Sequence, residues 1–122
     1  QALKDDDITV FGDGEQIRAF TFVKDIVDGI YLTSVANDHM NEIWNIGNGD
    51  NVATIKHMAE KVKEFTNSSS EITFVDPKTI HGPLFEEAWD KIPNAEKIKS
   101  LLGWKPTLGV DEIIETVIDY WK

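Results

Sequence analysis

Cysteine is absent from this 122-residue sequence. That absence excludes disulfides, thiolate metal ligands and cysteine nucleophiles, and it fits a reducing compartment, so we expect a cytoplasmic protein. No apolar run approaches the roughly 18 residues that span a bilayer, and no basic-then-apolar signal pattern is present, so we expect no membrane association. Positive charge is scarce, because 12 Lys and Arg stand against 22 Asp and Glu, a net charge of −10. So acidic a surface argues against nucleic-acid binding, which needs cations to neutralise phosphates.

Familiar catalytic patterns are missing as well. The three histidines show no HExxH or other paired-ligand spacing, so we expect no metal site. No GxSxG motif marks a hydrolase serine. Two glycine turns, at 12–14 and 47–49, fail the GxGxxG pattern because Ile17 and Val52 stand where the third glycine belongs. We interpret both as plain turns between elements.

The residues that are present predict one α/β domain over residues 1–122. Hydrophobic residues make up 41% of the chain, enough for a core in a domain of ordinary size. Strand and helix signals alternate, which predicts helices packed on a small, largely parallel sheet. We expect strands at 8–11, 42–46 and 71–75, helices at 23–36, 55–65, 95–102 and 110–121, and irregular structure at 78–93.

Two helices carry specific local signals. Thr54 is placed as the N-cap of the helix at 55–65, and Gly103 as the stop after 95–102. In the helix at 23–36, Asp25 lies in the first turn and suits the positive end of the helix dipole. Its apolar residues recur at i, i+3, i+4, i+7 and i+8, which predicts a buried face made of Val23, Ile26, Val27, Ile30 and Tyr31.

Arg18 is the only arginine in the chain. It follows the turn at 12–14 and precedes a helix. A guanidinium offers a planar fork for bidentate contact with phosphate or carboxylate. An ordinary surface ion pair with one of the 22 acids is equally open from the residues alone. The acidic pair Glu86-Glu87 is interpreted as a solvated face.

Four segments together resemble one family. Residues 8–27 resemble the GDGxQxRxFxxVxD segment of extended short-chain dehydrogenase/reductases, the NAD-dependent nucleotide-sugar epimerases and dehydratases of the UDP-glucose 4-epimerase type. Residues 44–48 resemble the family's FNIGN segment, residues 92–106 its RxPDxxKAxxxLGWxP segment, and residues 111–121 its closing helix. The resemblance covers nearly the whole chain, but only the C-terminal part of such proteins.

The resemblance implies a substrate-binding lobe without its partner domain. Family members carry an N-terminal Rossmann domain with a GxxGxxG turn for NAD and a catalytic YxxxK pair, and this sequence has neither. We therefore expect the lobe to hold a nucleotide-diphosphate sugar, the missing domain to bind NAD, and the isolated chain to catalyse nothing. Self-association through the uncovered apolar surface is also expected. A stand-alone, non-catalytic binding or interaction module is the alternative.

The resemblance also assigns site residues. Arg18 matches an arginine that reaches the diphosphate, Val10 and Phe11 lie on the strand along the nucleotide, and Gln16 matches a recurring polar position. A core role for Val10 stays open. Lys91 stands near the place of a second phosphate arginine, as a point charge without bidentate geometry.

Residues 81–89 depart from the family's pattern, which leaves the sugar and the base unassigned. Phe85 and Trp89 in this stretch either contact the ligand or pack beside a helix, and the residues alone do not decide.

Overall fold

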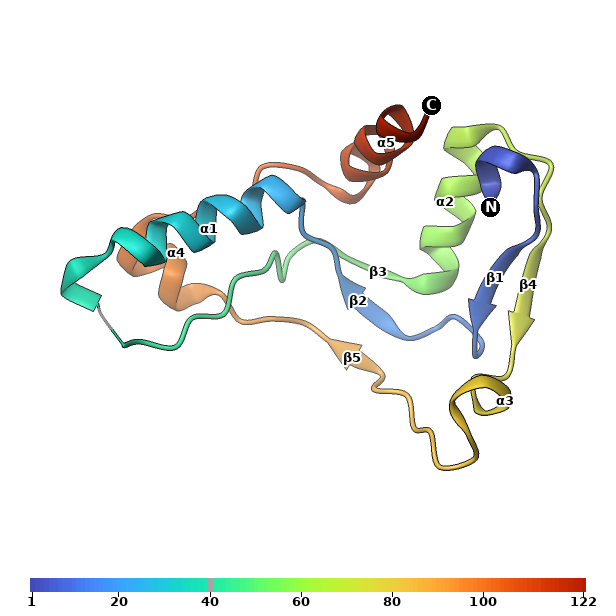
Figure 1. Ribbon diagram of the computed structural model, residues 1–122, viewed down its shortest axis with the longest axis horizontal. Helices are drawn as coiled ribbons and strands as arrows, with labels where there is room; N and C mark the ends of the chain where they lie inside the picture. Colours follow the sequence, from blue (N-terminus) through green and yellow to red (C-terminus); the bar gives the residue numbers. More distant parts are fainter. Residues whose placement is uncertain (40) are drawn as a thin grey trace.

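The computed structural model describes residues 1–39 and 41–122. Its elements in chain order are η1 (Ala2–Lys4), β1 (Ile8–Phe11), β2 (Ile17–Ala19), α1 (Val23–Val35), η2 (Asn37–His39), β3 (Val52–Thr54), α2 (Ile55–Thr66), β4 (Ile72–Val75), α3 (Lys78–His81), β5 (Asp90–Lys91), α4 (Glu96–Leu102) and α5 (Val110–Trp121) (Figure 1). Within the described residues no helix is long and apolar enough to cross a membrane.

The strands form two small sheets. β1 and β4 pair in parallel, from Ile8 opposite Ile72 to Phe11 opposite Val75. In the second sheet, β2 lies between β3, to which it is antiparallel, and β5, to which it is parallel. The α/β prediction with largely parallel pairing is confirmed, although the strands divide between two sheets rather than one.

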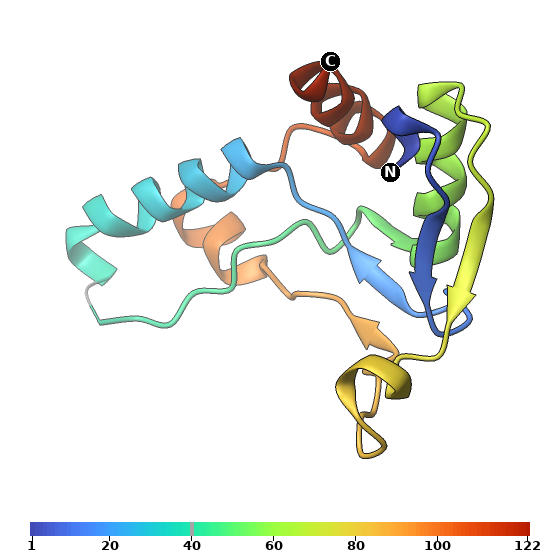
Figure 2. The same ribbon diagram turned by 45° about the vertical axis from the view of Figure 1, so that its right-hand side comes forward.

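Two separate clusters make the core. The first joins η1, β1 and α2 through Ala2, Ile8, Val10 and Ala59. The second lies around α4 and the turn after it, and consists of Ala95, Ile98 and Trp104 with partly buried neighbours that include Trp44 and Ile46. The turned view shows the same division, with α1 and α4 at one end of the molecule and α2, β1 and β4 at the other (Figure 2).

The predicted helix boundaries are confirmed where a capping residue marked them. Thr54 caps α2, because its Oγ1 accepts the N–H of His57 at 3.1 Å. Gly103 ends α4 in the left-handed conformation at φ 68°. Glu112 caps α5 by accepting the N–H of Gly109 at 2.8 Å, and Ile114 and Ile118 of that helix are buried.

The strand predicted at 42–46 is wrong. None of these residues joins a strand ladder with another described residue. Trp44 and Ile46 pack instead on the second cluster, while Ile43, just before Trp44, is 87% exposed. A strand pattern needs an edge to pair with, and none of the described strands offers one here. The stretch 78–93, expected to be irregular, contains α3 and β5, and β2 and β3 were not predicted.

The buried face predicted for α1 is also wrong. Four of the five stripe residues are more than half exposed: Val23, Val27, Ile30 and Tyr31. The helix turns a different face inward, on which Asp25 and Gly29 are buried. Trp104 explains the choice, because its indole N–H donates to the Asp25 carbonyl at 2.8 Å. A side chain at Gly29 would meet this indole at 3.1 Å, so the glycine lets Trp104 approach the helix.

Candidate functional site

A cavity opens where β1 and β4 end. The carboxyl ends of parallel strands meet at one edge, which is where α/β sheets commonly bind ligands. Residues after β1 and after β4 line a cavity of about 500 Å³ at this edge, and the segment between α3 and β5 closes it. The lining consists of Phe11, Gly12, Asp13, Gln16, Pro77, Lys78, Phe85, Glu86, Glu87 and Trp89.

Aromatic rings form one side of this cavity. Phe11 meets His81 edge to face with 6.0 Å between ring centroids, and His81 lies 4.8 Å from Phe85 at a small tilt. Trp89 also lines the cavity and is 61% exposed. Exposed aromatic faces of this kind can stack against a nucleotide base. Both Phe85 and Trp89 therefore lie at the cavity rather than in a helix-packing position.

Gln16 and Phe11, which the resemblance assigns to ligand binding, both line the cavity and contact each other. Gln16 is buried, and its Nε2 donates to the Phe11 carbonyl at 3.1 Å. This bond joins the end of β1 to the start of β2 across the turn at 12–14. Val10 is placed differently, because its side chain is buried in the first cluster. Only the backbone groups of Val10 remain for a ligand, so its binding role stays a prediction.

Arg18 is held at the margin of the cavity by three acceptors. Its Nη1 donates to the carbonyls of Ile17 at 2.7 Å and Trp89 at 3.1 Å. Its Nη2 pairs with the carboxylate of Glu87. The ion pair that the residues left open is therefore present, but it joins Arg18 to a residue that lines the cavity. The interpretation of Glu87 as part of a solvated face is wrong, since its side chain is only 28% exposed.

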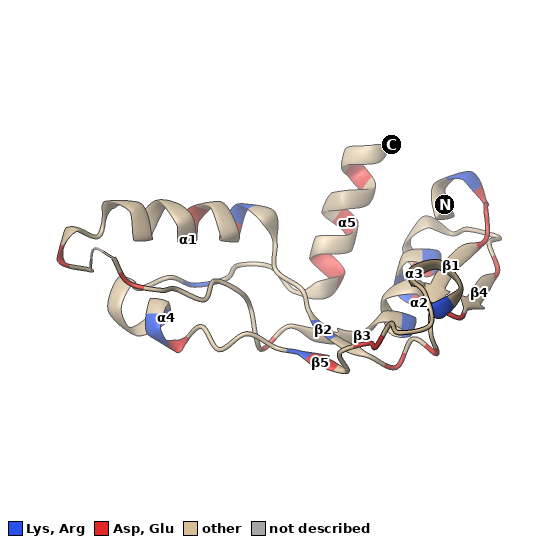
Figure 3. Cartoon of the chain, turned by 60° about the horizontal axis from the view of Figure 1, so that its bottom comes forward, with Lys and Arg blue, Asp and Glu red and all other residues tan. Residues whose placement is uncertain are grey.

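Lys91 lies directly beside Arg18. β5 pairs with β2 so that Lys91 stands opposite Arg18 in the register. The two basic positions lie on adjoining strands in Figure 3. Lys91 is exposed, and neither cation is among the residues that line the cavity. The sheet thus places two positive charges next to each other at the cavity's margin.

The lining as it stands is acidic. Asp13, Glu86 and Glu87 face one lysine, Lys78, and Glu87 occupies the guanidinium of Arg18. Three of the five N–H donors of Arg18 are used in these bonds, so an anionic ligand at this guanidinium competes with the Glu87 carboxylate.

Lys78 and Glu87 are two of the lining residues that the sequence did not assign to the site. Lys78 comes three residues after β4, and its place just past a strand end is a signal that could have found it. No local pattern marks Glu87, because its partner Arg18 is 69 residues away in the sequence.

The glycine turn at 47–49 does not fit a dinucleotide cradle. A side chain at Gly47 would meet Pro93 at 2.6 Å, and one at Gly49 would meet the Pro93 carbonyl at 2.5 Å. These glycines therefore allow close packing against Pro93 and leave no approach for a pyrophosphate at that face. Residues 1–39 and 41–122 also contain no group of three His, Asp or Glu side chains arranged to hold a metal ion.

Comparison with known proteins places the chain in a family. A family model described as GDP-mannose 4,6 dehydratase matches residues 1–117. The chain belongs to this family. UDP-glucuronic acid decarboxylase 1 of Danio rerio is 35% identical over 122 residues, which are 100% of this chain and 27% of that protein. UDP-N-acetyl-alpha-D-glucosaminuronate decarboxylase of Bacillus cytotoxicus is 32% identical over 121 residues, 99% of this chain and 37% of that protein.

Solved structures agree with the family and with the fold. The UDP-glucose 4-epimerase of Thermotoga maritima, solved with UDP-glucose, superposes with a TM-score of 0.81 at 27% identity, covering 98% of this chain and 36% of the other. The UDP-glucuronic acid 4-epimerase of Bacillus cereus, in complex with UDP-glucuronic acid and NAD, gives 0.82 at 26% identity, covering 97% and 36%. The resemblance to nucleotide-sugar epimerases and dehydratases is confirmed. This chain spans 27% to 37% of the length of these family members.

Proposed function

We propose that this chain is the nucleotide-sugar-binding part of an NAD-dependent enzyme that acts on a UDP-sugar. The observation that carries the proposal is the cavity at the carboxyl ends of β1 and β4, with aromatic rings on its wall and Arg18 at its margin. Relatives and structural neighbours named for UDP-sugars support the choice of nucleotide. Two relatives named as decarboxylases of UDP-linked uronic acids favour a substrate that carries a sugar carboxylate.

Binding in this cavity divides between two kinds of group. The base stacks on the aromatic wall, and the diphosphate takes the N–H donors of Arg18 once Glu87 has withdrawn, with Lys91 as a second cation alongside. Gln16 and the backbone at the end of β1 line the path between them. The lobe contributes positioning, which aligns the sugar for a reaction carried out by groups outside this chain.

NAD, bound by the remainder of the longer protein, supplies the hydride chemistry of that reaction. The exposed stripe of α1 is the surface on which we place this cofactor domain, because large apolar side chains gathered on one helix face favour a partner. Segment 42–46, which pairs with no described strand, follows α1 and offers the cofactor domain a further backbone edge for strand pairing. In the isolated chain the same surface favours self-association.

The test is Arg18→Ala in the longer protein, with Lys105→Ala as the control for loss of an exposed positive charge outside the cavity. Loss of a charge-assisted contact of about 1.5–3 kcal/mol raises KM for UDP-glucuronic acid roughly 10- to 100-fold. We expect kcat to change much less, and Lys105→Ala to leave KM unchanged. An unaltered KM in Arg18→Ala would contradict the assignment. Tight, saturable UDP binding by the 122-residue chain alone would favour the stand-alone module instead.

A further inference from the structure

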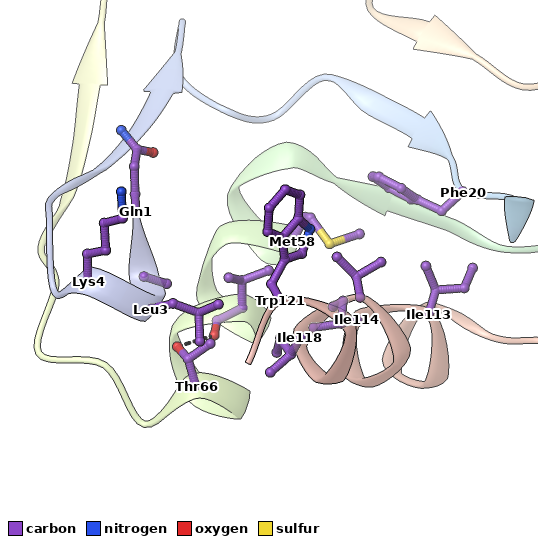
Figure 4. A pocket seen from close by; sticks show the side chains of 13 residues that line it. Gln1, Leu3, Lys4, Phe20, Met58, Thr66, Ile113, Ile114, Ile118 and Trp121 are labelled. Carbon is purple, nitrogen blue, oxygen red and sulfur yellow. Dashed lines mark hydrogen bonds between the residues drawn. The ribbon is translucent and has the colours of Figure 1, made fainter.

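The ligand cavity at the ends of β1 and β4 differs in kind from the other large hollow of the molecule. The groove of about 710 Å³ between α2 and α5 is mainly apolar, and Lys4 is the only charged residue among the described residues of its lining (Figure 4). Four of the ten residues described around the ligand cavity are charged, namely Asp13, Lys78, Glu86 and Glu87. Charged groups on a cavity wall select among ligands by the donors and acceptors that each ligand presents.

Lys78 lies on the side of this cavity where the aromatic wall is. It begins α3, soon after β4, and its N–H donates to Oδ1 of Asp76 at 2.9 Å. Its carbonyl accepts the N–H of Gly82 at 3.0 Å. His81 follows three residues later in α3, and its ring centroid lies 4.8 Å from that of Phe85. Residues three apart on a helix share a face, so the Lys78 side chain leaves α3 on the side of these rings.

The ammonium of Lys78 is not neutralised by the acids around it. Asp13 and Glu86 line the same cavity, yet in the described part of the chain no carboxylate forms an ion pair with this lysine. The two cations that we assign to the diphosphate, Arg18 and Lys91, come from the other sheet, on β2 and β5. Lys78 is therefore a separate donor, placed beside the rings on which the base stacks.

The two common pyrimidine bases differ at the group that such a donor meets. Uracil carries the carbonyl oxygen O4, an acceptor, where cytosine carries an amino group, a donor. Lysine only donates hydrogen bonds, so it binds O4 and repels the amino group. Carboxylates only accept, so Asp13 and Glu86 by themselves favour the amino group of cytosine. The lysine reverses the preference that the acidic lining has without it.

We propose that Lys78 is the residue by which this cavity selects a uracil nucleotide over a cytosine nucleotide, through a hydrogen bond from its ammonium to O4 of the base. The inference rests on the proposed function, because it requires the base to stack on the aromatic wall. It adds a side chain that reads the identity of the base, whereas Arg18 and Lys91 bind the phosphates that UDP and CDP share.

The test compares UDP with CDP in calorimetric titrations of the longer protein. Lys78→Met removes the charge and keeps an unbranched side chain, Lys78→Arg keeps the donors, and Lys105→Met removes an exposed charge outside the cavity. We expect the unaltered protein to bind UDP at least about tenfold more tightly than CDP, which is the effect of one hydrogen bond to a charged group. Lys78→Met should reduce this ratio about tenfold, while Lys78→Arg and Lys105→Met should retain it.

The ratio of the two Kd values, measured on one preparation, is insensitive to partial unfolding and separates base selection from a general charge effect. Equal weakening of UDP and CDP in Lys78→Met would mean that the lysine acts on the diphosphate, and it would overturn the proposal. Unchanged affinities in Lys78→Met, or equal binding of UDP and CDP by the unaltered protein, would overturn it as well. Arg18→Ala tests the proposed function separately, because it should weaken both nucleotides and keep their ratio. If neither nucleotide binds saturably, the proposed function fails, and this inference fails with it.

Discussion

Glu87 is paired with the guanidinium to which we assign the ligand diphosphate, so the proposed function predicts that removal of the Glu87 charge strengthens ligand binding. The Arg18 and Glu87 side chains are 19% and 28% exposed. The free-energy contribution of their pair is therefore expected between that of an exposed ion pair, about 0.2–1 kcal/mol, and that of a charge-assisted hydrogen bond, about 1.5–3 kcal/mol. A phosphate that replaces Glu87 at Arg18 binds at the cost of the free energy of this ion pair. If it contributes about 1.4 kcal/mol, Glu87→Gln lowers the Kd for UDP roughly tenfold.

The neighbouring carboxylate provides the control. Glu86 lines the same cavity, so Glu86→Gln removes the same charge from the lining while leaving the Arg18–Glu87 pair in place. Calorimetric titration of the longer protein with UDP should show the tightening in Glu87→Gln, and only a small change in Glu86→Gln because salt screens the general charge effect. Equal effects of the two substitutions, or weaker binding in Glu87→Gln, would refute the competition between Glu87 and the diphosphate.

Two further predictions concern stability. Asp25 is buried, and its carboxylate accepts both the N–H and the hydroxyl of Thr107, at 2.9 and 2.7 Å. Asp25→Ala leaves these donors unpaired and should cost about 3 kcal/mol in denaturant unfolding, against less than about 0.5 kcal/mol for Asp28→Ala on the exposed face of α1. The N–H of Ser69, with serine hydroxyls, holds the pKa of the Asp5 carboxyl below its ordinary value of 3.8. Its ionised form is therefore favoured in the folded state, so the stabilisation is present above that pKa and is lost as the pH falls through the lowered one. Asp5→Asn should flatten the fall of Tm between about pH 5 and pH 3, and an unchanged pH profile would contradict this.

Local signals in the sequence predicted the elements that are decided locally. Thr54 satisfies a backbone N–H within its own helix, and the stripe of α5 repeats often enough to exclude a strand. The strands β2, β3 and β5 have only two or three residues each, too few for a period to be recognised. Their pairing comes from partners far along the chain.

The error at α1 has a different cause. Periodicity locates an apolar stripe, but it does not say which partner is present to cover it. In this chain Trp104, 79 residues from Asp25, packs against the opposite face, and the stripe is left exposed. A strand pattern without a strand partner at 42–46 has the same explanation.

At the candidate site, the resemblance supplied Arg18, Phe11 and Gln16, and the structure brings the last two into contact. No sequence pattern could supply Glu87, because the bond to Arg18 depends on how the segment before β5 folds back over the cavity. The acidic lining is thus a property of the fold that charge counting along the chain does not reveal.

The segment that closes the cavity is fastened to the sheet by a carbonyl. The oxygen of Trp89 accepts both the N–H of Ile17 at 2.8 Å and the Arg18 guanidinium at 3.1 Å. Every amino acid has such an oxygen, so the fastening survives replacement of any side chain between α3 and β5. The side chains of this wall can therefore change one at a time while these backbone contacts of the segment are kept, as is common for loops carried on a fixed scaffold.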